Sequence, residues 1–201
     1  MHIKTASTEH PIHDILRDRW SPRAFNGQTI ENKQLLSLFE AARWTPSASN
    51  IQPWSFIIGK KGDDTYNKIN QTLVEFNQLW ATTAPVLMLA IAQTTNSKKQ
   101  PNISALYDLG QSVASLTFQA GALGLYVHQM GGFNTSEAAR LFEIPEDYTV
   151  ATAIAIGHLG DPAMLHENLQ KMETAPRQRR QANEFVFGAK FGQPSEIFNQ
   201  Q

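Results

Sequence analysis

A run of nine apolar residues, Ala84 to Ala92 (APVLMLAIA), limits most strongly what this chain can fold into. The run is far too short to cross a bilayer, because a membrane-spanning helix needs about 20 apolar residues. Such a short run predicts a strand buried in the core. Two further segments have the same character, Trp54 to Ile58 (WSFII) and Thr149 to Ile156 (TVATAIAI). The sequence therefore predicts a central, well-buried sheet.

Helical spacing of apolar residues occurs between these strands. It is clearest from Ser104 to Leu123, where apolar residues recur at spacings of three and four: Leu106, Leu109, Val113, Leu116 and Ala120. We also predict helices at Ile30 to Trp44, Leu73 to Trp80 and Ser136 to Phe142, and a strand at Leu125 to Gln129. Helices and strands do not alternate regularly, which favours an α+β fold over a doubly wound sheet. A chain of this length is expected to form a single domain, residues 1–201.

The last part of the chain is polar and basic from Ala163 onward, except for an apolar patch at Phe185 to Phe187. This segment has too few apolar residues to build a core of its own. We therefore expect it to wrap over another surface, and a second copy of the chain is the simplest partner.

Composition excludes several classes of function. The net charge of −1 gives no reason to expect nucleic acid or an anionic membrane as a partner. Without cysteine the chain cannot form disulfides, thiolate nucleophiles or iron–sulfur clusters. Its six histidines are scattered, so we expect no metal site, and the polar N-terminus does not resemble a signal peptide, so we expect a cytoplasmic protein. Any redox chemistry would have to come from a bound cofactor.

The first candidate binding segment is RWSPRAF, Arg19 to Phe25. Arg19 and Arg23 are four positions apart, and their guanidinium groups suit bidentate contact with a phosphate. Ser21 between them adds a hydroxyl donor. A solvated surface turn explains the same spacing.

The second candidate follows a predicted helix and enters a predicted strand, from Pro46 to Trp54 (PSASNIQPW). The two prolines stiffen a loop rich in small hydroxyl and amide groups: Ser47, Ser49, Asn50 and Gln52. Amide side chains both donate and accept, which suits the polar edge of a heterocycle. An ordinary Ser/Asn turn is the alternative.

Two further segments are weaker on their own. In Gln129-Met130-Gly131-Gly132, the two glycines allow the backbone to approach a flat ligand closely, although a plain turn has the same composition. Arg177, Arg179 and Arg180 could surround a phosphate or stabilise negative charge on a ring, or simply be solvated.

Taken in order, these segments resemble the flavin-dependent nitroreductase superfamily. The motifs that carry the resemblance are RWSPRAF, ARWTPSASNIQPW, GQSVASLTFQAGALGLYVHQMGGF, AIAIGHLGDP and APRQRRQANEFVF, and they extend from about Ile15 to Phe187. The resemblance implies a central, mostly antiparallel sheet flanked by helices. It also implies an intertwined homodimer with a C-terminal extension.

The resemblance further implies non-covalently bound FMN at the dimer interface. Arg19, Ser21 and Arg23 match the motif that holds the phosphate, the ribityl chain and the ring edge. The loop at Ser47 matches one that reaches the flavin of the other subunit, and Gly131 and Gly132 match the turn near flavin N5. The full set of implied cofactor-binding residues is Arg19, Trp20, Ser21, Arg23, Pro46, Ser47, Ser49, Asn50, Gln52, Gln129, Met130, Gly131, Gly132, Arg179 and Arg180.

The chain departs from the family pattern in two places. Gly131 stands where relatives often carry an acidic residue, which leaves only backbone near N5. Arg180-Gln181-Ala182 stands where relatives have Lys-Pro-Leu, so which of Arg177, Arg179 and Arg180 contacts the phosphate stays open. The residue that meets the flavin pyrimidine also stays open, with Asn77 and Lys68 as candidates.

The function implied is an FMN-dependent oxidoreductase without a catalytic side chain. It would take hydride from NADH or NADPH and pass two electrons to a small, electron-poor acceptor such as a nitro compound, quinone or enal, in a ping-pong cycle. Dehalogenation, flavin fragmentation and non-catalytic flavin binding are the alternatives on the same fold.

Overall fold

A four-stranded antiparallel sheet forms the centre of the molecule, in a computed structural model that describes residues 4–96 and 98–199. Its order is β1-β2-β4-β3, and each neighbouring pair is antiparallel. The strands are β1 (Trp54–Lys60), β2 (Val86–Gln93), β3 (Tyr126–Met130) and β4 (Tyr148–Gly157). The predicted α+β class with a mostly antiparallel sheet is confirmed, and all four predicted strands are present.

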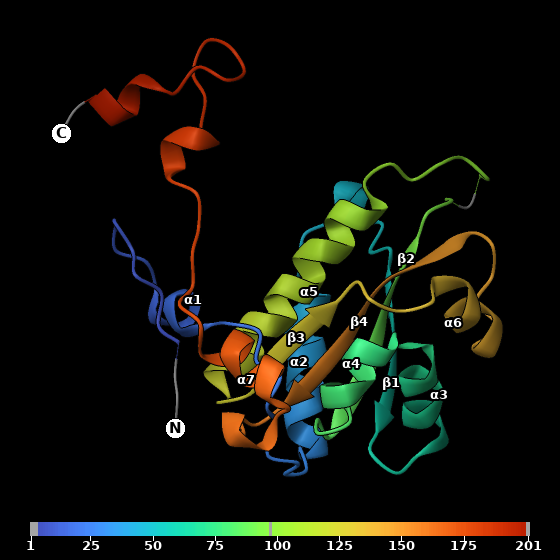
Figure 1. Cartoon of the computed structure of the whole chain (residues 1–201). Coiled ribbons are helices and arrows are strands. Elements are labelled where there is room, and N and C mark those ends of the chain that lie inside the picture. The colour runs from blue at the N-terminus through green and yellow to red at the C-terminus, as the bar shows by residue number, and fades with distance from the viewer. Residues whose placement is uncertain (1–3, 97, 200–201) are drawn as a thin grey trace.

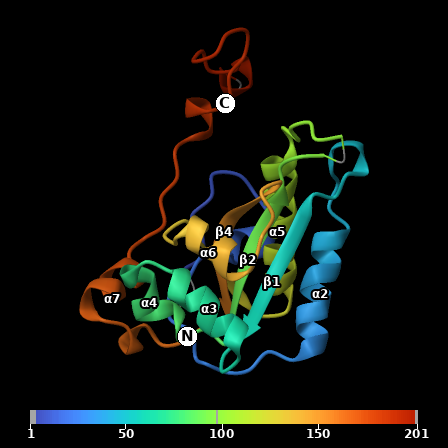
Figure 2. The ribbon, with the colours of Figure 1, turned by 90° about the vertical axis from the view of Figure 1, so that its right-hand side faces the viewer.

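Helices cover both faces of this sheet (Figures 1 and 2). One face carries α2 (Asn32–Arg43) and α5 (Ala105–Ala122). The other carries α3 (Asp64–Thr72), α4 (Glu75–Ala81), α6 (Thr135–Leu141) and α7 (Glu167–Thr174). The remaining short elements are α1 (Asp14–Asp18), η1 (Ala48–Asn50), η2 (Pro162–Met164), η3 (Ala182–Glu184) and η4 (Glu196–Asn199). Among the described residues, no helix is both long enough and apolar enough to span a membrane.

The apolar run in β2 is explained by burial on both faces. Val86 and Met88 point into the core beneath α2 and α5, whereas Leu87 and Leu89 point into the core on the opposite side. Since successive strand residues face opposite ways, a strand covered on both sides has no polar position.

Three helices were not predicted, α1, α3 and α7, and all are short and polar. In α3, Tyr66 and Ile69 are the apolar residues that reach the core, and the helix begins where the Asp63 carboxylate accepts a hydrogen bond from the Tyr66 N–H. In α7 only Leu169 and Glu173 are buried. So few buried positions leave no apolar stripe to detect.

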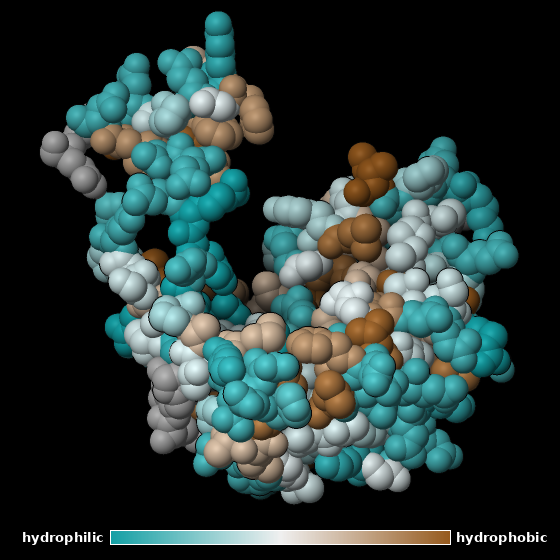
Figure 3. Space-filling view, in the orientation of Figure 1, coloured by the Kyte–Doolittle hydropathy of each residue, from teal (hydrophilic) through white to brown (hydrophobic). Residues whose placement is uncertain are grey.

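The C-terminal segment beyond α7 extends away from the main body (Figures 1 and 3). We call residues 175–199 the tail. The tail folds on itself where the rings of Phe187 and Phe191 meet edge to face with centroids 4.9 Å apart. It nevertheless exposes 96% of Phe191 and 66% of Ile197, which is unusual for large apolar residues with no role in an interface.

Candidate functional site

The segment Arg19–Phe25, which we call the arm, runs beside strand β3. The ring of Trp20 meets that of Tyr126 edge to face, with centroids 6.3 Å apart. Farther along, the carbonyl oxygen of Pro22 lies 2.8 Å from Nδ1 of His128. These contacts place RWSPRAF alongside the strand that leads to Gly131.

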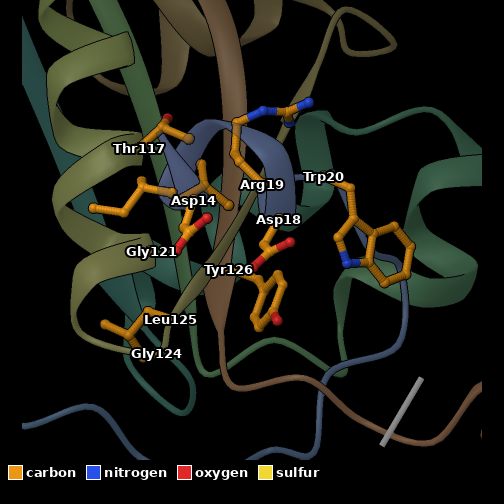
Figure 4. Close-up of a pocket in the computed structure, with 11 residues that line it drawn as sticks. Asp14, Asp18, Arg19, Trp20, Thr117, Gly121, Gly124, Leu125 and Tyr126 are labelled. Carbon is orange, nitrogen blue, oxygen red and sulfur yellow. The ribbon is translucent and has the colours of Figure 1, made fainter. Parts of the chain in front are cut away.

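A pocket of about 520 Å³ opens where the arm meets the tail, and its lining includes four arginines, Arg19, Arg177, Arg179 and Arg180, against one carboxylate, Glu9. We call it the basic pocket. None of the ion pairs found in residues 4–96 and 98–199 involves these four arginines. The side chain of Arg19 extends away from the carboxylates of Asp14 and Asp18 (Figure 4). Burial lowers the pKa of Arg19, and so do the charges of Arg177 and Arg179, which marks a concentration of positive charge.

The arginines of the basic pocket differ in the contacts that they make within the chain. Arg177 donates from Nη1 to the carbonyl oxygens of Lys4 at 2.9 Å and Arg17 at 2.8 Å, so it ties the base of the tail to the N-terminal segment. Arg179 donates to the adjacent carbonyl of Gln178, and Arg180 lies over the ring of Phe185 at 5.6 Å. Arg19, Arg179 and Arg180 therefore remain available to an anion.

Arg23 lies apart from the basic pocket. The spacing argument that put Arg19 and Arg23 on one face of a turn does not hold, because the backbone is already extended at Arg19. The guanidinium of Arg23 instead lies 6.0 Å from the Trp80 ring centroid, and its Nη1 lies 3.9 Å from Oε2 of Glu173. Sequence reasoning missed Glu173, because a single glutamate in a polar segment carries no signal of burial.

The two glycines stand at the other end of β3. The carbonyl oxygen of Gly132 accepts hydrogen bonds from Asn77 Nδ2 at 2.9 Å and from the Val74 N–H at 3.1 Å. Gly131 is exposed, and a Cβ added to it would meet nothing within 4 Å. The structure thus leaves a bare stretch of backbone at Gly131. Met130 just before it is buried in the core.

Of the two candidates for the pyrimidine contact, the structure brings Asn77 to this turn. Asn77 is 8% exposed and bonded to Gly132, whereas Lys68 lies over the ring of Phe142 at 6.0 Å.

The loop Pro46–Gln52 lies at the opposite end of helix α5 from the arm. The N–H of Ala48 donates to the carboxylate of Asp108 at 3.1 Å, in the first turn of α5. Near the other end of α5, a Cβ added to Gly121 would lie 3.4 Å from Ile15. Thirteen residues of helix separate these points, which is about 20 Å. The loop therefore lies about 20 Å along α5 from the end of that helix where Ile15 of α1 packs.

The loop itself has a defined shape. Ser49, Asn50 and Gln52 adopt left-handed backbone angles with φ of 50°, 55° and 53°, and the N–H of Gln52 donates to Oγ of Ser47 at 2.9 Å. Left-handed conformations cost about 1 kcal/mol each outside glycine. Surrounding contacts must hold them, and Asp108 supplies one.

The residues along β3 suit a phosphorylated flavin. The basic pocket offers unneutralised cations for a phosphate, and the backbone at Gly131 offers a flat surface for a ring. Between them, Arg23 Nε and Trp20 Nε1 are buried without a hydrogen-bond partner among the described residues. Buried donors normally have partners, so these two mark the arm as a place where hydrogen bonding within the chain is incomplete.

Comparison with known proteins agrees with this geometry. The model of the nitroreductase family matches residues 16–77 and 61–158. The chain belongs to the nitroreductase family. The matched region includes the arm, the loop at residues 46–52, β3 and both glycines, and it ends before the arginines of the tail.

Three relatives are informative. A solved structure described as an oxidoreductase containing FMN is 32% identical, covers 96% of this chain and 99% of its own, and superposes with a TM-score of 0.89. A 15.4 kDa protein of Mycolicibacterium smegmatis without an assigned activity is 29% identical over 147 residues, 69% of this chain and 98% of its own length. A protein of Archaeoglobus fulgidus, provisionally named NADH dehydrogenase/NAD(P)H nitroreductase, is 23% identical over 157 residues, 76% of this chain and 88% of its own.

Proposed function

We propose that this nitroreductase-family protein binds FMN along β3 and works as an NAD(P)H-dependent oxidoreductase. One observation carries the proposal. Arginines that form no ion pair among the described residues and open glycine backbone stand at the two ends of one strand, and the arm runs beside that strand. The FMN content of the relative with a TM-score of 0.89 supports the same assignment.

The chain's own residues divide the work of binding. Arg19, Arg179 and Arg180 hold the phosphate by charge, and Ser21 adds a hydroxyl along the arm. Arg23 would place positive charge near the ring, and the backbone of the glycine turn would lie against it. FMN supplies the two-electron chemistry for which the chain has no side chain of its own.

We also propose that the working unit is a homodimer. The loop at residues 46–52 contacts the first turn of α5, about 20 Å along that helix from the end where α1, which leads into the arm, packs. In a dimer, the loop of the second copy would close the site and limit access of water to it. NADH or NADPH is the proposed electron donor, and small electron-poor molecules such as nitroarenes, quinones and enals are the proposed acceptors.

Absorbance spectroscopy tests this function. The protein saturated with FMN and passed through a desalting column is expected to remain yellow, to bleach with NADH or NADPH under nitrogen, and to regain colour with a nitroarene or quinone. Retention of FMN without bleaching would assign a flavin-binding module instead of an enzyme. A colourless protein that ignores added FMN would refute the proposal altogether.

A further inference from the structure

Glu173 is a fully buried carboxylate that holds the arm. It lies on α7 with none of its surface exposed, and its Oε1 accepts hydrogen bonds from the N–H groups of Arg23 at 2.8 Å and Ala24 at 3.0 Å. Two consecutive backbone donors thus converge on one oxygen. This contact fixes the arm at the point where Arg23 leaves it.

The second oxygen of Glu173 is used quite differently. Oε2 is buried without a hydrogen-bond partner, at 3.9 Å from Arg23 Nη1. A well-formed arginine–carboxylate hydrogen bond is 2.7–2.9 Å long, so this pair is electrostatic but loose. Arg23 Nε is also buried and unpartnered. The Arg23 side chain is 19% exposed, and its guanidinium makes no hydrogen bond among the described residues, so its exposed part can contact another ligand.

A neutral acceptor could hold two N–H groups as well as a carboxylate does. Burying the charge of Glu173 with only a loose ionic partner is unfavourable. The presence of a carboxylate here, instead of a neutral acceptor, therefore indicates a role for its negative charge. The nearby groups are positive or neutral. Lys4 has its pKa lowered by burial and by Arg23 but raised by Glu173, so all three charges act on one another. Burial lowers the pKa of His128 to about 4, which keeps that ring neutral near pH 7. The charge of Glu173 is thus directed at Arg23 and Lys4.

The proposed ring position is connected to this pair through α4. Asn77 on that helix bonds Gly132, and one turn later Trp80 lies 6.0 Å from the Arg23 guanidinium. Arg23 therefore lies near both Glu173 and the helix that bonds the glycine turn.

We propose that Glu173 is a positioning residue that sets how much positive charge Arg23 presents to bound FMN. The inference rests on the proposed FMN site. Arg23 alone would favour the reduced, negatively charged flavin. Glu173 offsets part of that charge while holding the arm, and so keeps the flavin easier to reoxidise.

The test compares Glu173→Gln with Glu167→Gln. The second change lies on the same helix, where Glu167 is exposed and paired with Lys171 at 3.0 Å. Glutamine keeps an oxygen for the two N–H groups and removes the charge. For Glu173→Gln we expect the affinity for reduced FMN relative to oxidised FMN to rise about tenfold, which equals about 30 mV in the midpoint potential of a two-electron couple. Glu167→Gln should match the unaltered protein.

A purely structural role would give another result. In that case Glu173→Gln would lower thermal stability or weaken both redox forms equally, leaving the potential unshifted, and the inference would be overturned. Glu173→Ala, which also removes the acceptor, should weaken binding of oxidised FMN, and unchanged binding would contradict the role of Glu173 in holding the arm.

If Glu173→Gln does not fold, the same shift in midpoint potential is measured with Glu173→Met, which keeps the volume without the charge. The absence of a shift overturns the inference. If the unaltered protein binds FMN and the variant shows no shift in midpoint potential, only the proposed role of Glu173 is rejected. If the unaltered protein does not bind FMN, both the proposed function and the role of Glu173 are rejected.

Discussion

At the scale of single residues, Arg19 is the side chain on which phosphate binding most depends, because its charge is partly buried and has no acidic partner among the described residues. Replacing it with alanine removes a charge-assisted hydrogen bond worth about 1.5–3 kcal/mol. We expect Arg19→Ala to weaken FMN binding by about 10- to 100-fold. Titration by flavin fluorescence measures the loss. Riboflavin, which lacks the phosphate, is the control ligand, and Arg43→Ala, in an exposed pair with Glu40, is the control variant. An equal loss for riboflavin would show that Arg19 does not contact the phosphate.

Gly131 and Gly132 are adjacent but should respond oppositely to alanine. A Cβ on Gly132 would lie 2.7 Å from Asn77 Nδ2 and 3.0 Å from Val74 Cγ2, so Gly132→Ala must disturb a buried hydrogen bond. We expect it to lower the free energy of unfolding by about 1–2 kcal/mol. Gly131→Ala meets no atom within 4 Å and should leave apoprotein stability unchanged while weakening FMN binding. Urea unfolding and FMN titration of both variants separate the two effects. Tight FMN binding by Gly131→Ala would mean that the ring does not approach this backbone.

The sequence predicted the candidate site residues that are grouped in motifs, but not a residue such as Glu173 that stands alone in its segment. The clusters at Arg19, Ser47, Gly131 and Arg179 stand out because residues of one kind are adjacent in the chain. Glu173 reaches Arg23 across 150 positions, and neither residue shows this in its own neighbourhood. Such partners depend on how α7 packs, which local patterns do not encode.

At the scale of elements, the contact between the arm and β3 contains a histidine that burial keeps neutral near pH 7. His128 bonds the Pro22 carbonyl, and burial lowers its pKa to about 4 from its ordinary 6.5. Because the unfolded chain binds the proton more readily, stability is complete above pH 6.5 and is lost as the pH falls toward 4. The shift corresponds to about 3 kcal/mol. We therefore expect the wild type to lose about 3 kcal/mol more than His128→Asn between pH 7 and pH 4, as measured by urea unfolding. Parallel loss in both proteins would mean that other groups drive acid unfolding.

Several of the elements that the sequence predicted bury a continuous apolar face. Strands β2 and β4 and helices α2 and α5 are of this kind. The predicted bounds of all four strands and of α2, α4, α5 and α6 differ from the observed ones by two residues at most. The helix predicted from Leu73 begins at Glu75, because Leu73 and Val74 are extended with ψ of 144° and 152°. Its predecessor α3 depends on the cap at Asp63 more than on apolar content.

At the scale of the whole molecule, the exposed apolar surface indicates where a second copy would pack. Ile103, just before α5, exposes 95% of its surface, and Tyr107, in the first turn of α5, exposes 72%. Phe191 in the tail exposes 96%. Figure 3 shows apolar surface running down the face of the main body beside the tail. Large apolar patches of this kind usually belong to interfaces. The same face begins next to the loop at residues 46–52, which Asp108 holds to α5.

Complementation between two defective chains tests whether each site combines the arginines of one copy with the loop of the other. One chain carries Arg19→Ala. The other carries Ser49→Gly and Asn50→Gly, which remove both side chains and keep the left-handed backbone that these positions need. Each homodimer should bind FMN poorly at both sites. In a mixed dimer, one site contains both the substituted arginine and the substituted loop, and the other site contains neither. Mixed dimers, purified through a different tag on each chain, should therefore retain close to one tightly bound FMN per dimer. If each site used the loop and arginines of the same chain, the mixed dimer would bind as poorly as its parents, and a monomer in analytical ultracentrifugation would exclude a shared site directly.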